Sequence, residues 1–358
     1  MLIEAVEAAW QATWPVLLFL VVITLVSDLC ADARVFDVAA HLFARAAGGR
    51  TLLLFALYCL LATVTTVLLS IDTTAVMLTP VALALAAELD LPPLPFAFAT
   101  IWLANGASLL LPISNLSNLL AVERTGQSAG EFVADLWLPQ LVVLVVVLGV
   151  LFVRFRASIR GRYAVPRVLP AHDRVLVVAA SVIALGIAIG TVVGTPAWLA
   201  ATIGLLLLVG LCLLRDPALV RPARLFSLVP ARIVLGAFAL FVLVELALVV
   251  FEPDTIGWPN DVVLAGSAAV LSNAVNNLPA WLALAPVTPS SSYPALLVGI
   301  NVGGMLLLWG SLANLLWLRR CAKVGVTVTA ARFAKEGVAV VPLAVLLGAL
   351  ACGLRGAG

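Results

Sequence analysis

The stretch Asn105–Leu120, NGASLLLPISNLSNLL, decides the fold, because it returns near the other end of the chain as Asn301–Leu316, NVGGMLLLWGSLANLL. An offset of 196 residues aligns the two stretches and places Asn118 on Asn314, with a pair of leucines after each. The chain therefore contains an internal repeat.

Each copy of the repeat lies in a hydrophobic segment that is long enough to cross a bilayer, yet carries Asn, Ser, Gly or Pro through its middle. Lipid cannot hydrogen-bond a broken backbone, so such a break is tolerated only where it is buried in protein or lines a cavity. Paired Gly/Pro-interrupted segments in two halves of a membrane protein indicate the substrate site of a transporter.

Composition places the chain among polytopic membrane proteins. Of its 358 residues, 64% are hydrophobic and 11% are charged, and the mean hydropathy is +1.19, whereas soluble domains are about 45–50% apolar and about 25% charged. The acidic N-terminus lacks the basic region of a secretory signal, so we expect the first hydrophobic segment to be retained. The five cysteines show no CxxC spacing, and we predict no disulfide framework, metal site, cofactor or nucleic-acid partner.

Two hydrophobic regions are predicted to enter the membrane and turn back. The region 51–87 is interrupted by Ser70–Thr74, and 262–286 is interrupted by Ser272–Asn277. A polar tip without charged flanks is typical of a re-entrant hairpin. Eight crossings then remain, and both termini lie on one side. The hydrophobic segments are Trp14–Cys30, Thr51–Leu69, Ile71–Ala87, Phe96–Val122, Leu136–Val153, Val175–Thr191, Ala197–Leu214, Ile233–Phe251, Val262–Pro286, Tyr293–Leu318 and Gly337–Gly353.

The basic residues orient this layout. If both termini are outside, the inside stretches hold 18 of the 20 Lys and Arg residues, and only Arg124 and Arg355 are outside. The positive-inside rule supports this arrangement, and we expect a bacterial inner-membrane protein. The inside stretches are 31–50, 154–174, 215–232 and 319–336.

We therefore predict an all-α polytopic membrane protein with two inverted-topology repeats, each with a re-entrant hairpin and a discontinuous helix. The N-terminal repeat spans residues 1–153 and is shortened, because it has one crossing before its hairpin where the C-terminal repeat has three. Residues 154–174 are predicted to form a cytoplasmic linker, and residues 175–358 the C-terminal repeat.

The motifs resemble those of the arsenite/antimonite permease (ArsB-type) family of the ion transporter superfamily, which is related to the divalent anion:sodium symporters. They are Ser70–Thr74 with Leu78–Pro80, Ala107–Leu109 with Pro112–Asn118, Ser272–Pro279, Asn301–Gly303 and Trp309–Leu318. The resemblance implies an elevator-like carrier that exports trivalent arsenic or antimony, driven by the proton motive force or by a cytosolic ATPase partner. Outward Trp and Leu side chains would serve lipid or the partner of a homodimer equally well.

Four polar clusters are predicted to converge as a substrate site. No Lys or Arg occurs in 51–122 or 262–318, so the lining suits a small neutral oxyacid such as arsenite. Helix N-termini can also bind anions, which keeps a sodium- or proton-coupled carrier of a small anion as the alternative. Packing between membrane helices is the alternative role for these side chains. The predicted binding residues are Ser70, Thr73, Thr74, Asn105, Ser108, Ser114, Asn115, Asn118, Ser272, Asn273, Asn276, Asn277, Asn301, Gly310, Ser311 and Asn314.

Asp72 is the acid at a hairpin tip and is predicted to couple transport to protons. An ionised carboxylate at the bilayer centre costs about 2.5–3.5 kcal/mol and therefore usually faces a cavity. The alternative is a helix-capping acid. Glu245 is a second candidate for proton coupling, for which a structural partner is favoured. The two histidines, His41 and His172, lie in basic stretches, and HExxH, GxSxG and Walker A motifs are absent from the sequence, so we do not expect an enzyme.

Overall fold

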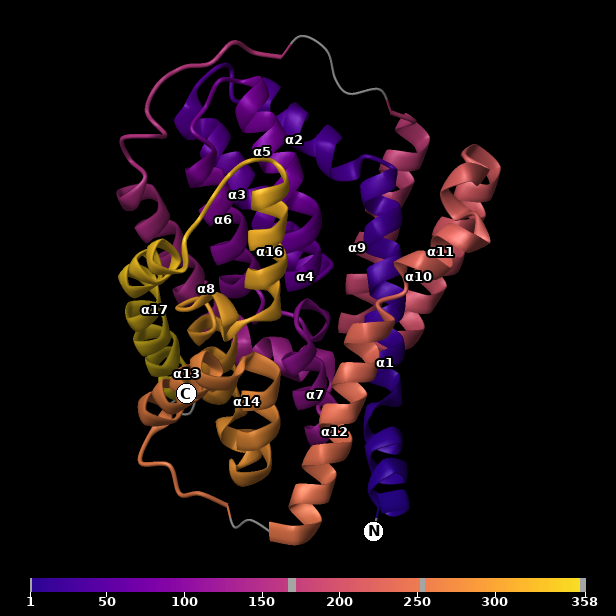
Figure 1. Ribbon diagram of the computed structural model, residues 1–358, viewed down its shortest axis with the longest axis vertical. Coiled ribbons are helices and arrows are strands. Elements are labelled where there is room, and N and C mark those ends of the chain that lie inside the picture. The colour runs from indigo at the N-terminus through magenta and orange to yellow at the C-terminus, as the bar shows by residue number, and fades with distance from the viewer. Residues whose placement is uncertain (1, 167–171, 252–254, 355–358) are drawn as a thin grey trace.

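The computed structural model describes residues 2–166, 172–251 and 255–354, and these residues form helices and loops with no strand among them. The predicted all-α polytopic class is confirmed (Figure 1). The first half holds α1 (Leu2–Asp32), α2 (Val35–Ala46), α3 (Thr51–Leu68), α4 (Ile71–Thr73), α5 (Thr79–Glu88), α6 (Pro93–Gly106), α7 (Leu116–Thr125) and α8 (Ala129–Arg154). The second half holds α9 (Arg174–Val192), α10 (Ala197–Arg215), α11 (Pro222–Leu228), α12 (Ala231–Phe251), α13 (Asp261–Val275), α14 (Asn277–Leu284), α15 (Tyr293–Leu297), α16 (Leu312–Lys323) and α17 (Ala330–Gly353).

The first re-entrant hairpin consists of α3 and the continuous helix formed by α4, a π-helical segment over Thr74–Leu78 and α5. Both of its outer ends are held at the upper end of the molecule in Figure 1. The Thr51 amide donates to the Gly161 carbonyl at 3.3 Å, and His41 of α2 lies 2.9 Å from the Glu88 carboxylate. The chain therefore turns back at Ser70 without reaching the lower end, as predicted.

The second hairpin consists of α13 and α14 and has the opposite orientation. It starts and ends in the lower half of Figure 1, and its turn points toward the middle of the molecule. Asn276 is the residue between the two helices. Each hairpin is followed by a broken helix. Helices α6 and α7 are separated by an unwound segment over 107–115, and α15, with its π-helical extension to Val302, is separated from α16 by residues 303–311. The two halves thus form the inverted-topology repeats predicted from the sequence.

The broken helices explain why length and composition alone count the crossings differently. In the described part of the chain, seven helices are long and apolar enough to cross a membrane, or eight if the bent pair α11–α12 is one span. That set includes both arms of the first hairpin and omits both broken helices. Tracing the chain in Figure 1 instead gives crossings by α1, α6–α7, α8, α9, α10, α11–α12, α15–α16 and α17, with both chain ends in the lower half.

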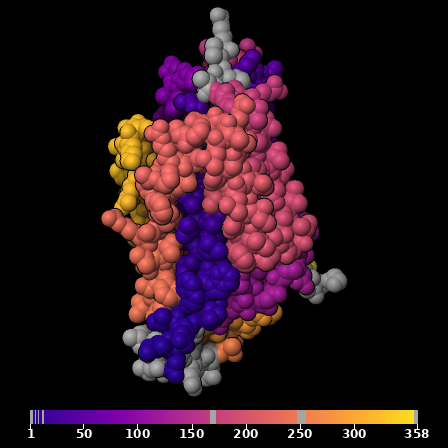
Figure 2. All heavy atoms as spheres, turned by 90° about the vertical axis from the view of Figure 1, so that its right-hand side faces the viewer, coloured from indigo at the N-terminus to yellow at the C-terminus, as the bar shows by residue number. Residues whose placement is uncertain are grey.

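The helices form two groups. Helices α1, α9, α10 and α12 pack against one another on the right of Figure 1, and we name them the α1 group. Helices α3–α8 and α13–α17 contain both hairpins and both broken helices, and we name them the hairpin group. Figure 2 shows the outer face of the α1 group, where α1 runs lengthwise between α9–α10 and α11–α12.

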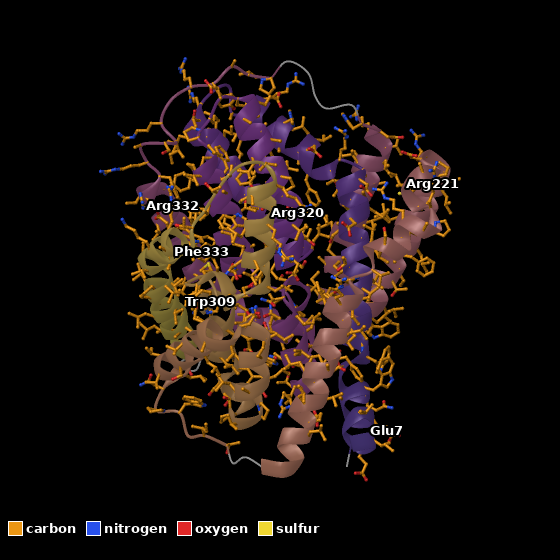
Figure 3. The ribbon with its side chains drawn as sticks, in the orientation of Figure 1. Glu7, Arg221, Trp309, Arg320, Arg332 and Phe333 are labelled. Atoms are coloured by element: carbon orange, nitrogen blue, oxygen red, sulfur yellow. The ribbon has the colours of Figure 1, made fainter. Side chains whose placement is uncertain are left out.

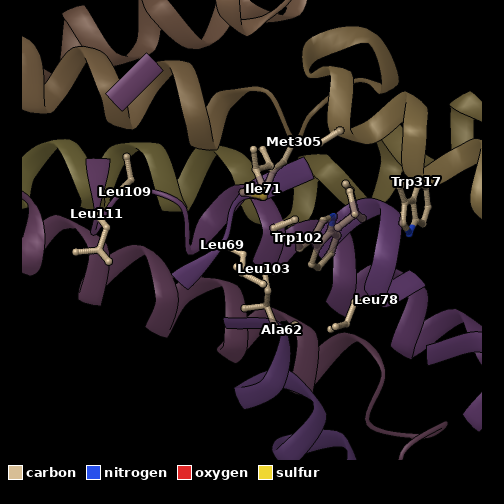
Figure 4. Packing of buried hydrophobic residues seen from close by; sticks show 14 of the residues in the cluster. Ala62, Leu69, Ile71, Leu78, Trp102, Leu103, Leu109, Leu111, Met305 and Trp317 are labelled. Atoms are coloured by element: carbon tan, nitrogen blue, oxygen red, sulfur yellow. The ribbon is translucent and has the colours of Figure 1, made fainter. Parts of the chain in front are cut away.

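Aromatic side chains fill the middle of the hairpin group. Trp102 of α6 and Trp317 of α16 are fully buried (Figure 4). Both rings pack against Phe98 of α6. The Trp317 indole also donates to the Ala97 carbonyl at 2.9 Å, which satisfies its polar atom. In lipid such close packing, together with hydrogen bonds between helices, holds the bundle together.

Two predicted inside stretches are more structured than the sequence indicated. Residues 31–50 contain the amphipathic helix α2, which buries Phe36, Val38, Ala40 and Ala44. The stretch 215–232, predicted only as a basic inside stretch, contains α11, which meets α12 at a bend of 41°. The basic side chains of Arg221 and Arg332 lie in the upper half of Figure 3, while Glu7 lies near the lower end.

Candidate functional site

A cavity of about 390 Å³ lies where four half-helices begin. Its wall contains the first residues, with adjoining cap residues, of the helix Ile71–Glu88 and of α7, α14 and α16. The α1 group closes the other side through Leu20 of α1 and the first half of α12. The lining residues of the half-helices are Ile71, Asp72, Asn115, Leu116, Ser117, Asn276, Asn277, Leu278, Pro279, Ser311, Leu312 and Ala313.

This arrangement determines the electrostatic character of the cavity. The first turn of a helix has N–H groups without intrahelical partners, and its end carries about half a positive elementary charge. Four such ends therefore present hydrogen-bond donors and positive potential to one small space. Arg232, in the first turn of α12, lines the same cavity.

Four fully buried asparagines fasten the two broken helices to each other. The Asn105 Nδ2 donates to the Asn314 Oδ1 at 3.1 Å, and the Asn301 Nδ2 donates to the Asn118 Oδ1 at 2.9 Å. Because the offset of 196 relates Asn105 to Asn301 and Asn118 to Asn314, these are the same bond made twice. The two copies of the sequence repeat thus make equivalent hydrogen bonds in the structure.

The same asparagines satisfy the unwound backbone. The Asn118 Nδ2 donates to the carbonyls of Ser108 and Leu111 at 2.7 and 3.0 Å. The Asn314 Nδ2 donates to the matching carbonyls of Gly304 and Leu307 at the same two distances. Carbonyl groups that leave a helix within a membrane need such partners, since lipid provides none.

Two further amides brace the unwound segments from neighbouring helices. Gln140 of α8 accepts from the Leu109 amide and donates to the Gly106 carbonyl, both at 2.8 Å. Asn273 of α13 accepts from the Leu307 amide at 2.9 Å and donates to the Gly303 carbonyl at 2.7 Å. Each unwound segment is therefore held by an amide side chain from a neighbouring helix that both donates and accepts a hydrogen bond.

The first hairpin tip is organised by hydroxyl groups. The Ser70 Oγ accepts from the Thr73 amide at 3.2 Å and caps the helix that follows. The Thr73 Oγ1 also lies 2.7 Å from the Ser27 Oγ of α1. The alternative role of Asp72 as the helix cap is therefore wrong, because Ser70 has that role. Within the described residues the Asp72 carboxylate makes no hydrogen bond, and it faces the cavity.

The second tip turns at Asn276, whose φ of 91° is unusual for a residue other than glycine. The Asn276 Nδ2 donates to the Trp309 carbonyl at 2.8 Å, which fixes the turn against the second broken helix. Strain of this kind persists only where surrounding contacts impose it, and it is concentrated at functional sites.

Asn115 is the polar side chain best placed to meet a ligand. It caps α7 and is 4% exposed, and it lines the cavity. Its Oδ1 accepts from the Ser117 amide at 3.4 Å, but its buried Nδ2 has no hydrogen-bond partner within the described residues. A buried donor without a partner costs about 1–3 kcal/mol, which a bound acceptor would recover.

A second cavity, of about 320 Å³, adjoins the first and extends along α1. Ser70, Thr73, Ser27 and Asp28 line it, together with Arg320 of α16. Six residues line both cavities, so the two spaces share one wall at the first hairpin tip. These six are Leu20, Ile71, Asp72, Asn115, Leu116 and Ile233.

The structure divides the predicted site residues into two sets. One set lines the first or the second cavity: Ser70, Asp72, Thr73, Asn115, Asn276, Asn277 and Ser311. The other set braces the helices around the cavities: Thr74, Asn105, Ser108, Ser114, Asn118, Ser272, Asn273, Asn301, Gly310 and Asn314. Glu245 lies elsewhere, in a cavity of about 280 Å³ with Arg124, and makes no hydrogen bond within the described residues.

The prediction that no basic residue lines the site is wrong, because one arginine lines each cavity. Helix α16 continues to Lys323 and contributes Arg320 to the second cavity, and α12 contributes Arg232 to the first. Sequence reasoning counted both arginines with the basic inside stretches. It also missed Ser117, although this residue lies in the Pro112–Asn118 motif, and it missed Ser27 and Asp28 because α1 was taken as an ordinary apolar helix. Asp28 could have been found from the sequence, because it is an acid within the apolar span Thr13–Asp32.

Comparisons with known proteins agree with this fold. A family model described as citrate transporter (CitMHS) matches residues 1–294. The arsenical pump membrane protein of Escherichia coli is 23% identical over 380 residues, which cover 98% of this chain and 88% of that protein. The putative arsenical pump membrane protein of Bacillus subtilis strain 168 is 25% identical over 345 residues, which cover 83% and 78%. The resemblance predicted from the motifs is confirmed.

Among solved structures, the crystal structure of the Alcanivorax borkumensis YdaH transporter, described as having an unusual topology, has a TM-score of 0.58 to this chain. It is 14% identical and the match covers all of this chain and 88% of that one. At this identity the likeness concerns the fold alone.

Proposed function

Since the chain belongs to the citrate transporter (CitMHS) family, we propose that it is a secondary active transporter that exports arsenite or antimonite across the bacterial inner membrane in exchange for protons. The observation that supports this most is the convergence of four half-helix N-termini on one cavity. Such ends, built from discontinuous helices near the middle of inverted repeats, are where transporters of this kind bind their substrates.

The chemistry of the cavity suits a small oxyacid. Backbone N–H groups, the Asn115 Nδ2 and the hydroxyl of Ser311 donate hydrogen bonds, while Asn277 and Asp72 provide acceptor oxygens. A trivalent arsenic or antimony oxyacid has both hydroxyl donors and oxygen acceptors, so it can satisfy both kinds of group.

The division into two helix groups supports an elevator-like mechanism. Both cavities lie between the hairpin group, which would carry the substrate, and the α1 group, which would stay fixed. The end that carries most basic residues would face the cytoplasm, and both termini would lie outside. The outer faces of α9 and α10 expose apolar side chains such as Val182 and Leu206, which suits lipid or the second subunit of a homodimer.

Asp72 is the residue we assign to proton coupling. It lines both cavities at the first hairpin tip, and an acid at this depth in a membrane typically belongs to an ion or proton pathway. Sodium is the alternative coupling ion, because asparagine and backbone oxygens are ligands for hard cations.

A second candidate function is the coupled transport of a small anion. The specific observation in its favour is Arg232, which adds a full positive charge to a cavity already surrounded by helix N-termini. The description of the matching family model points the same way.

Inside-out vesicles that contain the protein distinguish the two functions. With an imposed proton gradient, we expect accumulation of trivalent arsenic that a protonophore abolishes and that vesicles without the protein lack. Accumulation of citrate, and not of arsenic, under a sodium or proton gradient would favour the anion carrier. ATP is left out, so that any uptake reflects the gradient alone.

A further inference from the structure

Asp28 of α1 is an acid that the proposed mechanism has not used. It lies four residues before the end of α1, within the apolar span Thr13–Asp32, and it is half-buried. It lines the second cavity together with Asp72, so both carboxyl groups face one continuous space. Acids within apolar spans are rare and usually serve a pathway.

The surroundings of Asp28 connect it to the basic end of the molecule. One turn further along α1, Asp32 forms an ion pair with Arg224 of α11. Arg320 of α16 lines the same cavity and interacts electrostatically with Asp28, as do Asp32 and Arg224. These groups and Asp72 are the charged or titratable groups that face Asp28 across the described residues. Within those residues Asp28 makes no hydrogen bond, and its carboxyl group is in reach of water in the cavity that it lines.

Three hydroxyl groups, those of Ser27, Thr73 and Ser70, connect α1 to the first hairpin tip beside Asp28 and Asp72. The Ser27 Oγ lies 2.7 Å from the Thr73 Oγ1, which lies 2.9 Å from the Ser70 Oγ. Ser27 and Thr73 are the chain neighbours of Asp28 and Asp72, so this bond keeps α1 against the hairpin tip where the acids lie. The cavity has space for several water molecules, each of which takes about 30 Å³.

We propose that Asp28 relays protons between Asp72 and the basic end of the molecule, an inference that rests on the proposed coupling role of Asp72. The protonated Asp72 transfers its proton through cavity water to the Asp28 carboxylate. This leaves Asp72 ionised and Asp28 neutral. Asp28 then releases the proton to bulk water, which restores its carboxylate, and the reverse sequence loads Asp72.

The rate at which Asp72 exchanges its proton tests this relay without requiring any substrate. In the purified protein, the infrared carboxyl band that the Asp72→Asn variant lacks reports the protonation of Asp72 after a pH jump. Loss of a relay acid should slow this response at least about tenfold in the Asp28→Asn variant. The Asp28→Glu variant should restore it. Thr24→Val is the matched control, because Thr24 lines the same cavity and its hydroxyl bonds only the Leu20 carbonyl.

An Asp28→Asn response as fast as that of the native protein would overturn the proposal, as would the absence of any pH-dependent Asp72 band. Arsenic uptake by the same preparations separates this result from the proposed function. If the native protein moves no arsenic but the Asp72 band responds to pH and slows in Asp28→Asn, the relay stands and the substrate assignment fails.

Discussion

Replacement of Asn118 by alanine should lower the free energy of unfolding by about the summed contribution of the hydrogen bonds that its side chain makes. The side chain donates to two carbonyls and accepts from the Asn301 amide, so three interactions are lost within a fully buried site. Hydrogen bonds between membrane helices contribute about 0.6 kcal/mol on average and about 1.7 at most. The expected loss in the free energy of unfolding is therefore about 2–5 kcal/mol.

The inverted repeat makes this prediction sharper, because Asn314→Ala removes the matching three interactions at nearly identical distances. We expect the two substitutions to cost the same to within about 1 kcal/mol, since hydrogen bonds between membrane helices differ by about that amount between the average and the strongest. Steric-trap unfolding in bicelles measures both free energies. Ser181→Ala is the control, because that hydroxyl bonds only a carbonyl of its own helix and should cost close to nothing.

Two outcomes would refute the reasoning. A cost below about 0.5 kcal/mol for both asparagines would mean that the broken helices do not depend on these bonds, because that is within the range of neutral surface substitutions. A large cost for one asparagine and none for the other would mean that the two halves are not held by equivalent contacts.

Two further predictions concern packing and pH. Gly299→Ala should greatly reduce the yield of folded protein, because a methyl group there would overlap the Ala265 carbonyl oxygen, whereas Gly266→Ala meets nothing within 4 Å and should be tolerated; size-exclusion chromatography of the purified variants compares them. The Leu176 amide, at the start of α9, is the main cause that lowers the pKa of Asp173, which lies before the span. Its stabilising contribution is therefore present above the ordinary carboxyl range and lost as pH falls through the lowered pKa, so the decrease in Tm caused by Asp173→Asn should be present at pH 7 and absent at strongly acidic pH. An equal decrease at both pH values would contradict that sign.

The architecture could be predicted because it depends on two features that are visible in the sequence, the hydrophobic segments and the polar breaks within them. A hydrophobic segment is readable from composition, and a polar break within it, repeated at 105–120 and 301–316, indicates inverted halves. The eight crossings follow from treating 51–87 and 262–286 as hairpins, which the chain path in the structure agrees with.

The division of the polar residues between lining and bracing was not predictable in the same way. A membrane-buried asparagine can satisfy unwound backbone, as Asn118 does, or present a donor to a cavity, as Asn115 does. Residue type and spacing are the same for both roles, and only the three-dimensional path decides which carbonyls lie within reach. Arg232 was missed for a related reason. Charge counting assigned this arginine to a basic inside stretch, whereas the structure places it in the first turn of α12, which lines the cavity.

Net uptake of trivalent arsenic into inside-out vesicles, compared between the native protein and the Asp72→Asn variant, tests the proposed function most directly. We predict that a proton gradient drives accumulation by the native protein and not by the variant, while both exchange arsenic across the membrane when no gradient is imposed. Gradient-driven accumulation by Asp72→Asn equal to that of the native protein would contradict proton coupling at the first hairpin tip. The absence of arsenic movement by the native protein under either condition would contradict the proposed substrate.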